Sequence, residues 1–330
     1  MQKTSDEQYM CRAISLARCG AGLTYPNPMV GAVVVHKEQI IGEGYHIKAG
    51  TGHAEVNAIA SVGNKELLKE STIYVSLEPC SHYGKTPPCA KLIIDMGIPR
   101  VVVGCVDSFS EVSGRGIEML RNAGIDVTVG VLEDECRELN KRFFTFHEKH
   151  RPYIILKWAQ SADGFIDSVR DASAPAPWLS NDACRLLVHR QRAQEQAILV
   201  GAETIRRDNP SLTTRYFAGS DPMRIVLTGN NGIPPTSTVC TDGKPLTLIS
   251  GHQSAADVAT QLYQMGLQSV IVEGGRTTLQ MFIDSGLWDE AYVYCGNTTL
   301  GNGVKAPSIN LSGATLTNIE GCKLYNIRAH

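Results

Sequence analysis

The chain lacks any long apolar stretch. Across its 330 residues no run of hydrophobic side chains approaches the length of about 18 that a membrane-spanning helix needs. The first seven residues are polar and contain no apolar core of a secretory leader. We therefore expect a protein that has no membrane partner and works in the cytoplasm.

An excess of charge of either sign is also missing. The chain has 31 Lys and Arg against 33 Asp and Glu, so that its net charge is −2. Residues 151–330 contain no cluster of basic side chains with interleaved aromatic rings, the pattern that nucleic-acid-binding modules need. An RNA- or DNA-editing protein with such a C-terminal module is therefore disfavoured. Small phosphorylated substrates and no nucleic acid partner are expected.

The cysteines do not form the pattern of a disulfide framework. Ten of them are scattered through a long chain, which is typical of reduced thiols inside a cell. Cys80 and Cys89 differ from the rest because they follow His53-Ala54-Glu55. One imidazole and two thiolates are a common donor set for catalytic zinc, and they leave a fourth position for water. The alternative is a plain helix start and two buried thiols.

Glu55 is predicted to move protons. It lies two residues after His53, outside the three metal donors, where the zinc nucleobase deaminases carry a general acid/base carboxylate. Glycines 50 and 52 precede a predicted helix that carries both residues, and a predicted strand ends just before Cys80, which we expect at a second helix start. Residues 81–88 separate the two cysteines by more than the usual deaminase spacing. This loop is expected to contact the substrate.

The first half of the chain alternates between predicted strands and helices. A capping box of Thr4 and Glu7 precedes apolar residues at helical spacing. Predicted strands cover 30–35, 38–44, 73–77, 100–105 and 126–129, and predicted helices cover 53–61, 89–96, 114–122 and 133–147. This alternation is typical of an α/β sandwich. The polar segment 148–152, which ends in a proline, places a domain boundary between residues 149 and 150.

The second half begins with an apolar strand that carries a single lysine, Lys157. A helix around Arg192 and a strand at 197–200 follow. A buried strand at 269–272 then runs into Gly274-Gly275 and a helix start, where free backbone amides suit the pyrophosphate of a cofactor. The G-x-G-x-x-G pattern is missing, which argues against a Rossmann domain.

Several motifs together resemble one family. Residues 24–31, 42–46, 53–55 and 77–89, with the long inter-cysteine loop, are similar to the deaminase half of the bifunctional riboflavin-biosynthesis deaminase/reductase. The segments of residues 151–330 are similar to its reductase half. The resemblance implies a cytidine-deaminase-like α/β/α sandwich in residues 1–149, a zinc-dependent pyrimidine deaminase domain. A dihydrofolate-reductase-like α/β domain that uses NADPH is implied in residues 150–330.

The resemblance also implies roles for individual residues. Zn²⁺ would be held by His53, Cys80 and Cys89, with Glu55 catalytic and Asn27, His46 and His82 facing the substrate. The NADPH site would be formed by Ala159, Trp178, Thr204, Asp208, Gly275, Arg276, Thr277 and Thr278. The substrate of the second domain would contact Arg192, Leu212, Arg215 and Glu273. The two arginines suit a phosphate, because guanidinium groups offer it forked donors. Without the resemblance, Arg192 beside Arg190 would be assigned to a solvated helix face.

Three positions depart from the family pattern. Phe109 and Ala176 replace polar side chains that the family commonly places there, and Gly229 stands where a serine is frequent. The departures concern the rims of the two sites, and the predicted fold does not depend on them.

The sequence thus predicts a bifunctional enzyme. Hydrolysis by the first domain would remove the 2-amino group of 2,5-diamino-6-(ribosylamino)-4(3H)-pyrimidinone 5′-phosphate. The second would then reduce the ribosyl group to ribityl with NADPH, with Lys157 or Asp208 as the proton donor. The alternative is a deaminase whose second domain is inactive and only structural. A homo-oligomer is compatible with the sequence, which leaves the number of subunits open.

Overall fold

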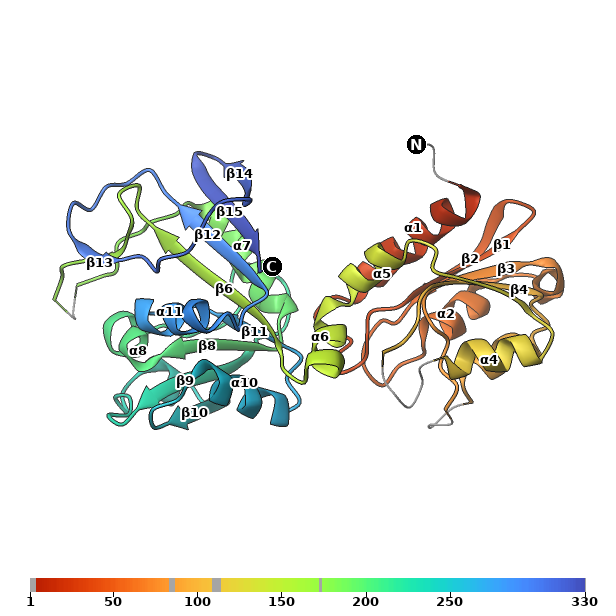
Figure 1. Cartoon of the computed structure of the whole chain (residues 1–330), viewed down its shortest axis with the longest axis horizontal. Coiled ribbons are helices and arrows are strands. Elements are labelled where there is room, and N and C mark those ends of the chain that lie inside the picture. Colours follow the sequence, from red (N-terminus) through yellow and green to blue (C-terminus); the bar gives the residue numbers. More distant parts are fainter. Residues whose placement is uncertain (1–3, 83–86, 109–113, 172–173, 330) are drawn as a thin grey trace. The chain divides into compact units, whose positions relative to one another are not determined.

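The chain divides into two compact units. The computed structural model describes residues 4–82, 87–108, 114–171 and 174–329 (Figure 1). Its contacts separate Met1–Lys149 from His150–His330. Each unit has its own sheet and its own apolar core. Among the described residues no helix is both long enough and apolar enough to cross a bilayer.

A five-stranded sheet in the order β2-β1-β3-β4-β5 forms the centre of the first unit (Figure 1). The strands are β1 (Gly31–His36), β2 (Gln39–Tyr45), β3 (Thr72–Leu77), β4 (Arg100–Cys105) and β5 (Asp126–Val129). β1 is antiparallel to β2 and β3, whereas β3, β4 and β5 are parallel. The sequence predicted all five strands, with bounds shifted by a residue or so.

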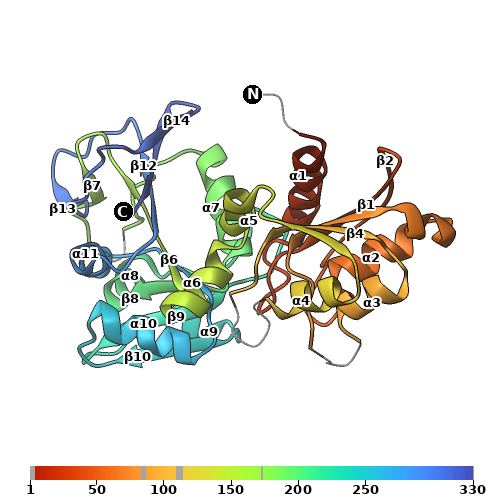
Figure 2. The ribbon, with the colours of Figure 1, turned by 45° about the vertical axis from the view of Figure 1, so that its right-hand side comes forward.

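Helices cover both faces of this sheet (Figure 2). They are α1 (Ser5–Ala17), α2 (Ala54–Ser61), α3 (Cys89–Asp95), α4 (Arg115–Asn122), α5 (Glu133–Leu139) and α6 (Lys141–Lys149), with short 3₁₀ helices at Arg18–Gly20 and Lys65–Glu70. Val33 packs with α1 and α5, while its neighbour Val34 packs with α2, α3 and α4, because successive strand residues face opposite sides of a sheet. The predicted α/β sandwich is confirmed, as is the capping box of Thr4 and Glu7.

The single helix predicted over residues 133–147 is wrong. Two helices, α5 and α6, meet at Asn140, whose backbone leaves the helical region. The side-chain amide of Asn140 accepts a hydrogen bond from the Met29 N–H at 2.8 Å and donates one to the Met29 carbonyl at 2.8 Å. An asparagine that bonds to the backbone of another segment interrupts a helix at modest cost, because this side chain competes well with helical hydrogen bonding.

The second unit has an eight-stranded sheet in the order β10-β9-β8-β11-β6-β12-β15-β14. Its strands are β6 (Tyr153–Gln160), β8 (Ala197–Gly201), β9 (Met223–Gly229), β10 (Leu246–Ser250), β11 (Ser269–Val272), β12 (Glu290–Cys295), β14 (Thr315–Ile319) and β15 (Cys322–Arg328). The run from β10 to β12 is parallel, and β15 and β14 are added antiparallel. A separate two-stranded sheet pairs β7 (Phe165–Ser168) with β13 (Gly303–Lys305).

Helices also lie on both faces of the second sheet (Figure 1). They are α7 (Asp182–Gln194), α8 (Ala202–Asp208), α9 (Thr238–Thr241), α10 (Ala255–Gln264) and α11 (Arg276–Ser285). α10 and α11 pack in one core, and α8 and α9 pack in the core on the other face. The parallel strands β8, β11 and β6 end at one edge of the sheet, and ligands of open parallel sheets bind at such carboxyl ends.

Candidate functional site

Three metal-binding side chains meet in the first unit. His53 precedes the first turn of α2, Cys80 follows β3, and Cys89 is the first residue of α3. The Nδ1 atom of His53 lies 3.5 Å from the Cys80 Sγ and 3.3 Å from the Cys89 Sγ, and the three donor atoms all lie within 4.8 Å of one another. A tetrahedral zinc with bonds of about 2.0 Å to nitrogen and about 2.3 Å to sulfur separates such donors by about 3.5 Å. The donor set therefore fits zinc.

The expected second helix start lies at Cys89 and not at Cys80. Cys80 is in the loop that follows β3, and the first backbone amide of α3 reaches back to it, with the Cys89 N–H 3.3 Å from the Cys80 Sγ. Hydrogen bonds from Cys89 and His53 lower the pKa of the Cys80 thiol despite its burial. The helix start thus helps to keep one sulfur donor in the thiolate form that binds metal.

Glu55 lies in the first turn of α2 and is 3% exposed. Its carboxyl contacts the Cys89 thiol but does not belong to the group of three donors. Burial, with the neighbouring Cys80, raises the pKa of Glu55 to about 7. A carboxyl beside the metal donors but outside them is placed to exchange protons with a molecule at the open position.

Two of the three predicted substrate contacts lie beside the donor set. The Asn27 amide bonds to the His46 Nε2 at 3.1 Å, and the His46 ring meets the His53 ring edge-on with centroids 5.5 Å apart. His82 is exposed at the start of the inter-cysteine loop. Residues 83–86 of that loop and Phe109 lie outside the described residues, so the structure does not test the roles expected of them.

A buried carboxylate that sequence reasoning missed fixes the chain before Cys80. Glu78 is 4% exposed and accepts hydrogen bonds from the backbone N–H groups of Asp107, Gly114, Gly116 and Ile117 at 2.8–3.3 Å. A Cβ atom at Gly116 would lie 1.9 Å from the Pro79 carbonyl oxygen, so only glycine allows this approach. The partners are 29–39 residues away, and no local pattern announces them.

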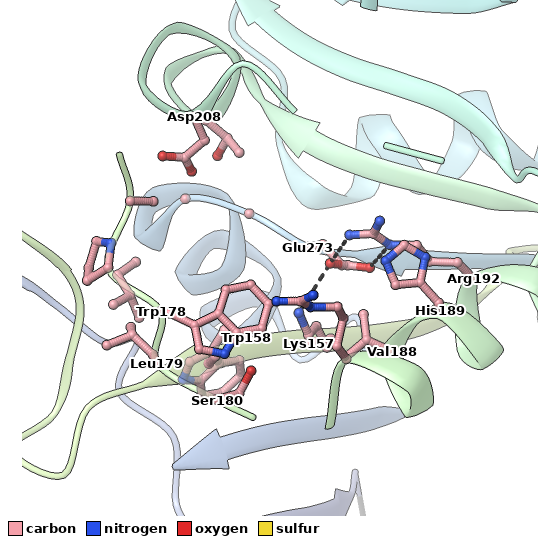
Figure 3. Close-up of a pocket in the computed structure, with 18 of the residues that line it drawn as sticks. Lys157, Trp158, Trp178, Leu179, Ser180, Val188, His189, Arg192, Asp208 and Glu273 are labelled. Atoms are coloured by element: carbon pink, nitrogen blue, oxygen red, sulfur yellow. Dashed lines mark hydrogen bonds and ion pairs between the residues drawn. The ribbon is translucent and has the colours of Figure 1, made fainter. Parts of the chain in front are cut away.

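The second unit has a cavity of about 460 Å³ at the carboxyl ends of its central strands. Figure 3 shows side chains from β6, α7, α8 and the segment after β11 around it. Ala159, Trp178, Thr204, Asp208 and Gly275 of the predicted cofactor residues line the cavity, as do Arg192, Arg215 and Glu273 of the predicted substrate residues. Ala176, one of the departures from the family pattern, also lines it.

The remaining predicted residues do not line the cavity. Arg276 and Thr277 are exposed in the first turn of α11, and Thr278 is buried against Gly201. Leu212 is 2% exposed and its side chain packs in the core, with a left-handed backbone at φ 55°. A contact of Leu212 with substrate would therefore have to involve its backbone.

Glu273 is the centre of a buried ion cluster (Figure 3). The Arg192 Nε donates to its Oε1 at 2.7 Å and the Nη2 to its Oε2 at 2.9 Å, while the Lys157 Nζ lies 3.3 Å from Oε2. Burial opposes ionisation, but Arg192 and Lys157 outweigh it and lower the pKa of Glu273 to about 2. The carboxylate is therefore ionised and fixes both cations.

The turn from β11 into α11 suits an anionic cofactor. Gly275 has a φ of 53°, which favours glycine, and a Cβ atom at Gly274 would lie 2.9 Å from the Thr204 Oγ1. Bare backbone at the start of a ten-residue helix leaves amide N–H groups to bind phosphate oxygens. The residues present therefore fit the pyrophosphate of a dinucleotide.

Sequence reasoning missed two further polar cavity residues on α7, Arg185 and His189. They stand seven and three positions before Arg192, so all three share one helix face. The helical spacing was a usable signal, since Arg192 was already a candidate. Tyr216, which follows Arg215, was also missed.

The first unit has the architecture and the donor set of the zinc-dependent nucleobase deaminases. Its residues 3–105 match the model of the cytidine and deoxycytidylate deaminase zinc-binding region, and residues 152–326 match the model of the RibD C-terminal domain. The protein is therefore a two-unit enzyme, a zinc hydrolase of the deaminase type joined to a reductase.

Relatives match this chain over most of their own length. The riboflavin biosynthesis protein RibD of Aquifex aeolicus is 38% identical, over 94% of this chain and 92% of its own, and that of Bacillus amyloliquefaciens is 41% identical over 92% and 87%. The crystal structure of a diaminohydroxyphosphoribosylaminopyrimidine deaminase/5-amino-6-(5-phosphoribosylamino)uracil reductase from Thermotoga maritima covers 99% of both chains with a TM-score of 0.88 and 35% identity. The chain belongs to the RibD family of bifunctional deaminase/reductases of riboflavin biosynthesis, which use zinc and NADPH.

Proposed function

We propose that His53, Cys80 and Cys89 hold zinc, and that the first unit removes the 2-amino group of 2,5-diamino-6-(ribosylamino)-4(3H)-pyrimidinone 5′-phosphate by hydrolysis. The observation that carries this proposal is the mutual distance of the three donor atoms, which matches a tetrahedral ion. Zinc in that position supplies Lewis-acid activation, which lowers the pKa of water toward neutrality.

Glu55 carries protons during this step. Its buried carboxyl takes a proton from the attacking water and delivers it to the departing amine, the role of a general acid/base. Asn27 and His46 hold the substrate beside it, because the His46 ring lies next to the His53 ring and the Asn27 amide bonds to His46. His82 and the loop that follows it complete the substrate contacts.

The second unit binds NADPH at Thr204 and Asp208 of α8 and at Gly275, which precedes α11. NADPH supplies the hydride that converts the ribosyl group to ribityl. The bare Gly274-Gly275 turn and the first turn of α11 hold the cofactor phosphates, and Trp178 and Ala159 also line the cavity. Arg276, Thr277 and Thr278 contribute backbone amides more than side chains.

Lys157 is the better placed of the two candidate proton donors. Its ammonium belongs to the Glu273 cluster with Arg192, among the residues assigned to the substrate. Asp208 lies apart from this cluster in Figure 3 and is bound by the buried guanidinium of Arg170. Lys157 can therefore give a proton to the substrate while Glu273 holds the Lys157 ammonium in position.

The protein works on a small phosphorylated aminopyrimidine in the cytoplasm, without nucleic acid or membrane partners, and its residues 1–149 and 150–330 are the two catalytic domains. The test is to incubate the zinc-loaded chain with the diaminopyrimidine phosphate, with and without NADPH, and to identify the products by mass. Deaminated product alone without NADPH, and its ribityl form with NADPH, support the proposal. Deamination without any reduction would favour the alternative of an inactive, structural second domain.

A further inference from the structure

The cavity of the second unit carries more positive than negative charge. The charged side chains that line it are Lys157, Arg185, Arg192, Arg215, Asp208 and Glu273. The Glu273 carboxylate forms ion pairs with Lys157 and Arg192. Asp208 is bound by Arg170, which does not line the cavity. Two guanidinium groups, those of Arg185 and Arg215, are left without a buried carboxylate.

Arg185 has only a weak acidic neighbour. Its Nη2 lies 3.4 Å from the Asp182 Oδ1, and the Asp182 side chain is 88% exposed. An ion pair with so exposed a carboxylate is screened by solvent and neutralises little charge. The Nε of Arg185 is buried and has no hydrogen-bond partner among the described residues. The hydrogen-bonding capacity of this guanidinium is therefore largely unused by the protein.

Arg215 is likewise held by neutral groups. Its Nη1 donates to the hydroxyl oxygens of Ser211 and Thr213, and no ion pair joins it to a carboxylate in the described part of the chain. The His189 Nδ1 accepts the Arg215 backbone N–H at 3.0 Å and so fastens this loop to α7. The charge of Arg215 is thus positioned but not compensated.

Tyr216 brings the two arginines together. The guanidinium carbon of Arg185 lies 4.9 Å from the centre of the Tyr216 ring, and that of Arg215 lies 6.0 Å from it. Arg185 also stacks over the Trp178 ring, with its guanidinium carbon 3.9 Å from the ring centre. Both aromatic residues are about half exposed at the cavity. A guanidinium that stacks on aromatic rings keeps its N–H edge available, because stacking uses only its faces.

Resting on the proposed reduction of a phosphorylated sugar, we propose that Arg185 binds the 5′-phosphate of the substrate together with Arg215, and that Trp178 and Tyr216 hold its guanidinium in position. Two uncompensated guanidinium groups suit a phosphate monoester, which carries nearly two negative charges at neutral pH. Arg192 has fewer N–H groups left to offer a phosphate, since three of them already bond to Glu273 and the Thr213 carbonyl.

The substrate is a better source of this phosphate than the cofactor. Arg185 lies on α7 together with Arg192, and its guanidinium contacts Tyr216, the residue after Arg215. Arg192 and Arg215 are both assigned to the substrate. The bare turn at Gly275, on a different segment, already offers a site for the cofactor phosphates.

Steady-state kinetics of the full chain with the deaminated substrate and NADPH test the proposal. Arg185→Met, which keeps length and apolar packing, should raise the KM for the phosphorylated substrate by about ten- to a hundredfold, as expected when one charge-assisted contact is lost. The kcat and the KM for NADPH should stay near those of the unaltered chain. Inorganic phosphate should inhibit the unaltered chain competitively, and its inhibition constant should rise in parallel with the KM. The KM of Arg185→Lys should lie between those of the unaltered chain and Arg185→Met, because lysine keeps the charge but loses the forked pair of N–H donors.

Arg190→Met is the matched control, since Arg190 lies exposed on the same helix and does not line the cavity. An unchanged KM and an unchanged phosphate inhibition constant in Arg185→Met would overturn the proposal. A rise in the KM for NADPH alone would also overturn it and assign Arg185 to the cofactor. Should Arg185→Met not fold, Arg185→Lys decides by the same two constants. Absence of NADPH-dependent reduction in the unaltered chain would instead contradict the proposed function.

Discussion

The His189 imidazole accepts the backbone N–H of Arg215 through its Nδ1 at 3.0 Å. Only a neutral ring can do this, because both nitrogens of a protonated imidazole are donors. Burial, followed by the charges of Arg192 and Arg215, lowers the pKa of His189 to about 4. The loop before Tyr216 is therefore fastened to α7 by a histidine that stays neutral at physiological pH.

This contact predicts a loss of stability in mild acid. The groups that act on His189 are Arg192, Arg215 and Lys157, which lower its pKa, and Glu273, which raises it. An unfolded histidine titrates near pH 6.5, so between that pH and about 4 the unfolded state binds more protons and stability falls as the pH falls. We expect a contribution on the order of 2 kcal/mol between pH 7 and pH 5.

His189→Asn is the variant to compare, because its side-chain oxygen accepts the same N–H and does not titrate. Denaturant unfolding of both proteins at several pH values measures the effect. The difference between their free energies of unfolding at each pH cancels the contribution of the other titrating groups. The variant should show a shallower decline of stability between pH 7 and pH 5. Identical pH profiles would show that His189 does not stay neutral in the folded protein.

Cys89→Ser should lower both the zinc content and the release of ammonia. A serine hydroxyl is a poor zinc ligand at neutral pH, and two protein donors hold the ion weakly. Metal analysis of protein purified without chelator, together with an ammonia assay, measures this. Cys19→Ser, at an exposed thiol, should change neither quantity. Full zinc occupancy and full deamination in Cys89→Ser would remove this residue from the metal site.

Glu55→Gln should separate chemistry from metal binding. The amide keeps the size of the side chain but cannot carry a proton, so the rate of deamination should fall by about 10² to 10⁴. Zinc content and NADPH-dependent reduction of the deaminated substrate should remain. A Glu55→Gln protein that deaminates normally would assign the proton transfer to another group.

Glu273→Leu should destabilise the second unit. The variant leaves two buried cations, Lys157 and Arg192, without their carboxylate, and breaking a buried ion pair in this way typically costs about 3–5 kcal/mol. The midpoints of thermal and denaturant unfolding of the second unit should fall, while deamination by the first unit persists. Asp284→Leu, at an exposed acid of α11, provides the comparison. Equal stability of the two variants would mean that the cluster contributes little.

The sequence alone singled out the three candidate metal donors that the structure brings together. His53, Cys80 and Cys89 are recognised by donor chemistry and spacing, and Glu55 by its place two residues after His53, so that no long-range information was needed. The capping box at Thr4, the strands of the first sheet and the strands β6, β8 and β11 of the second follow from patterns within a few residues.

Only the tertiary structure revealed the groups that position these residues. Glu78 bonds to amides some thirty residues later, and Asn140 interrupts a helix by bonding to Met29, 111 positions earlier. Arg185 becomes a candidate phosphate ligand because it stacks on Trp178 and Tyr216 and its acidic neighbour, Asp182, is exposed to solvent. The sequence determined which side chains can bind a metal or a phosphate. Which of them are already satisfied by other parts of the chain depends on packing between distant segments, and this was decided by the fold.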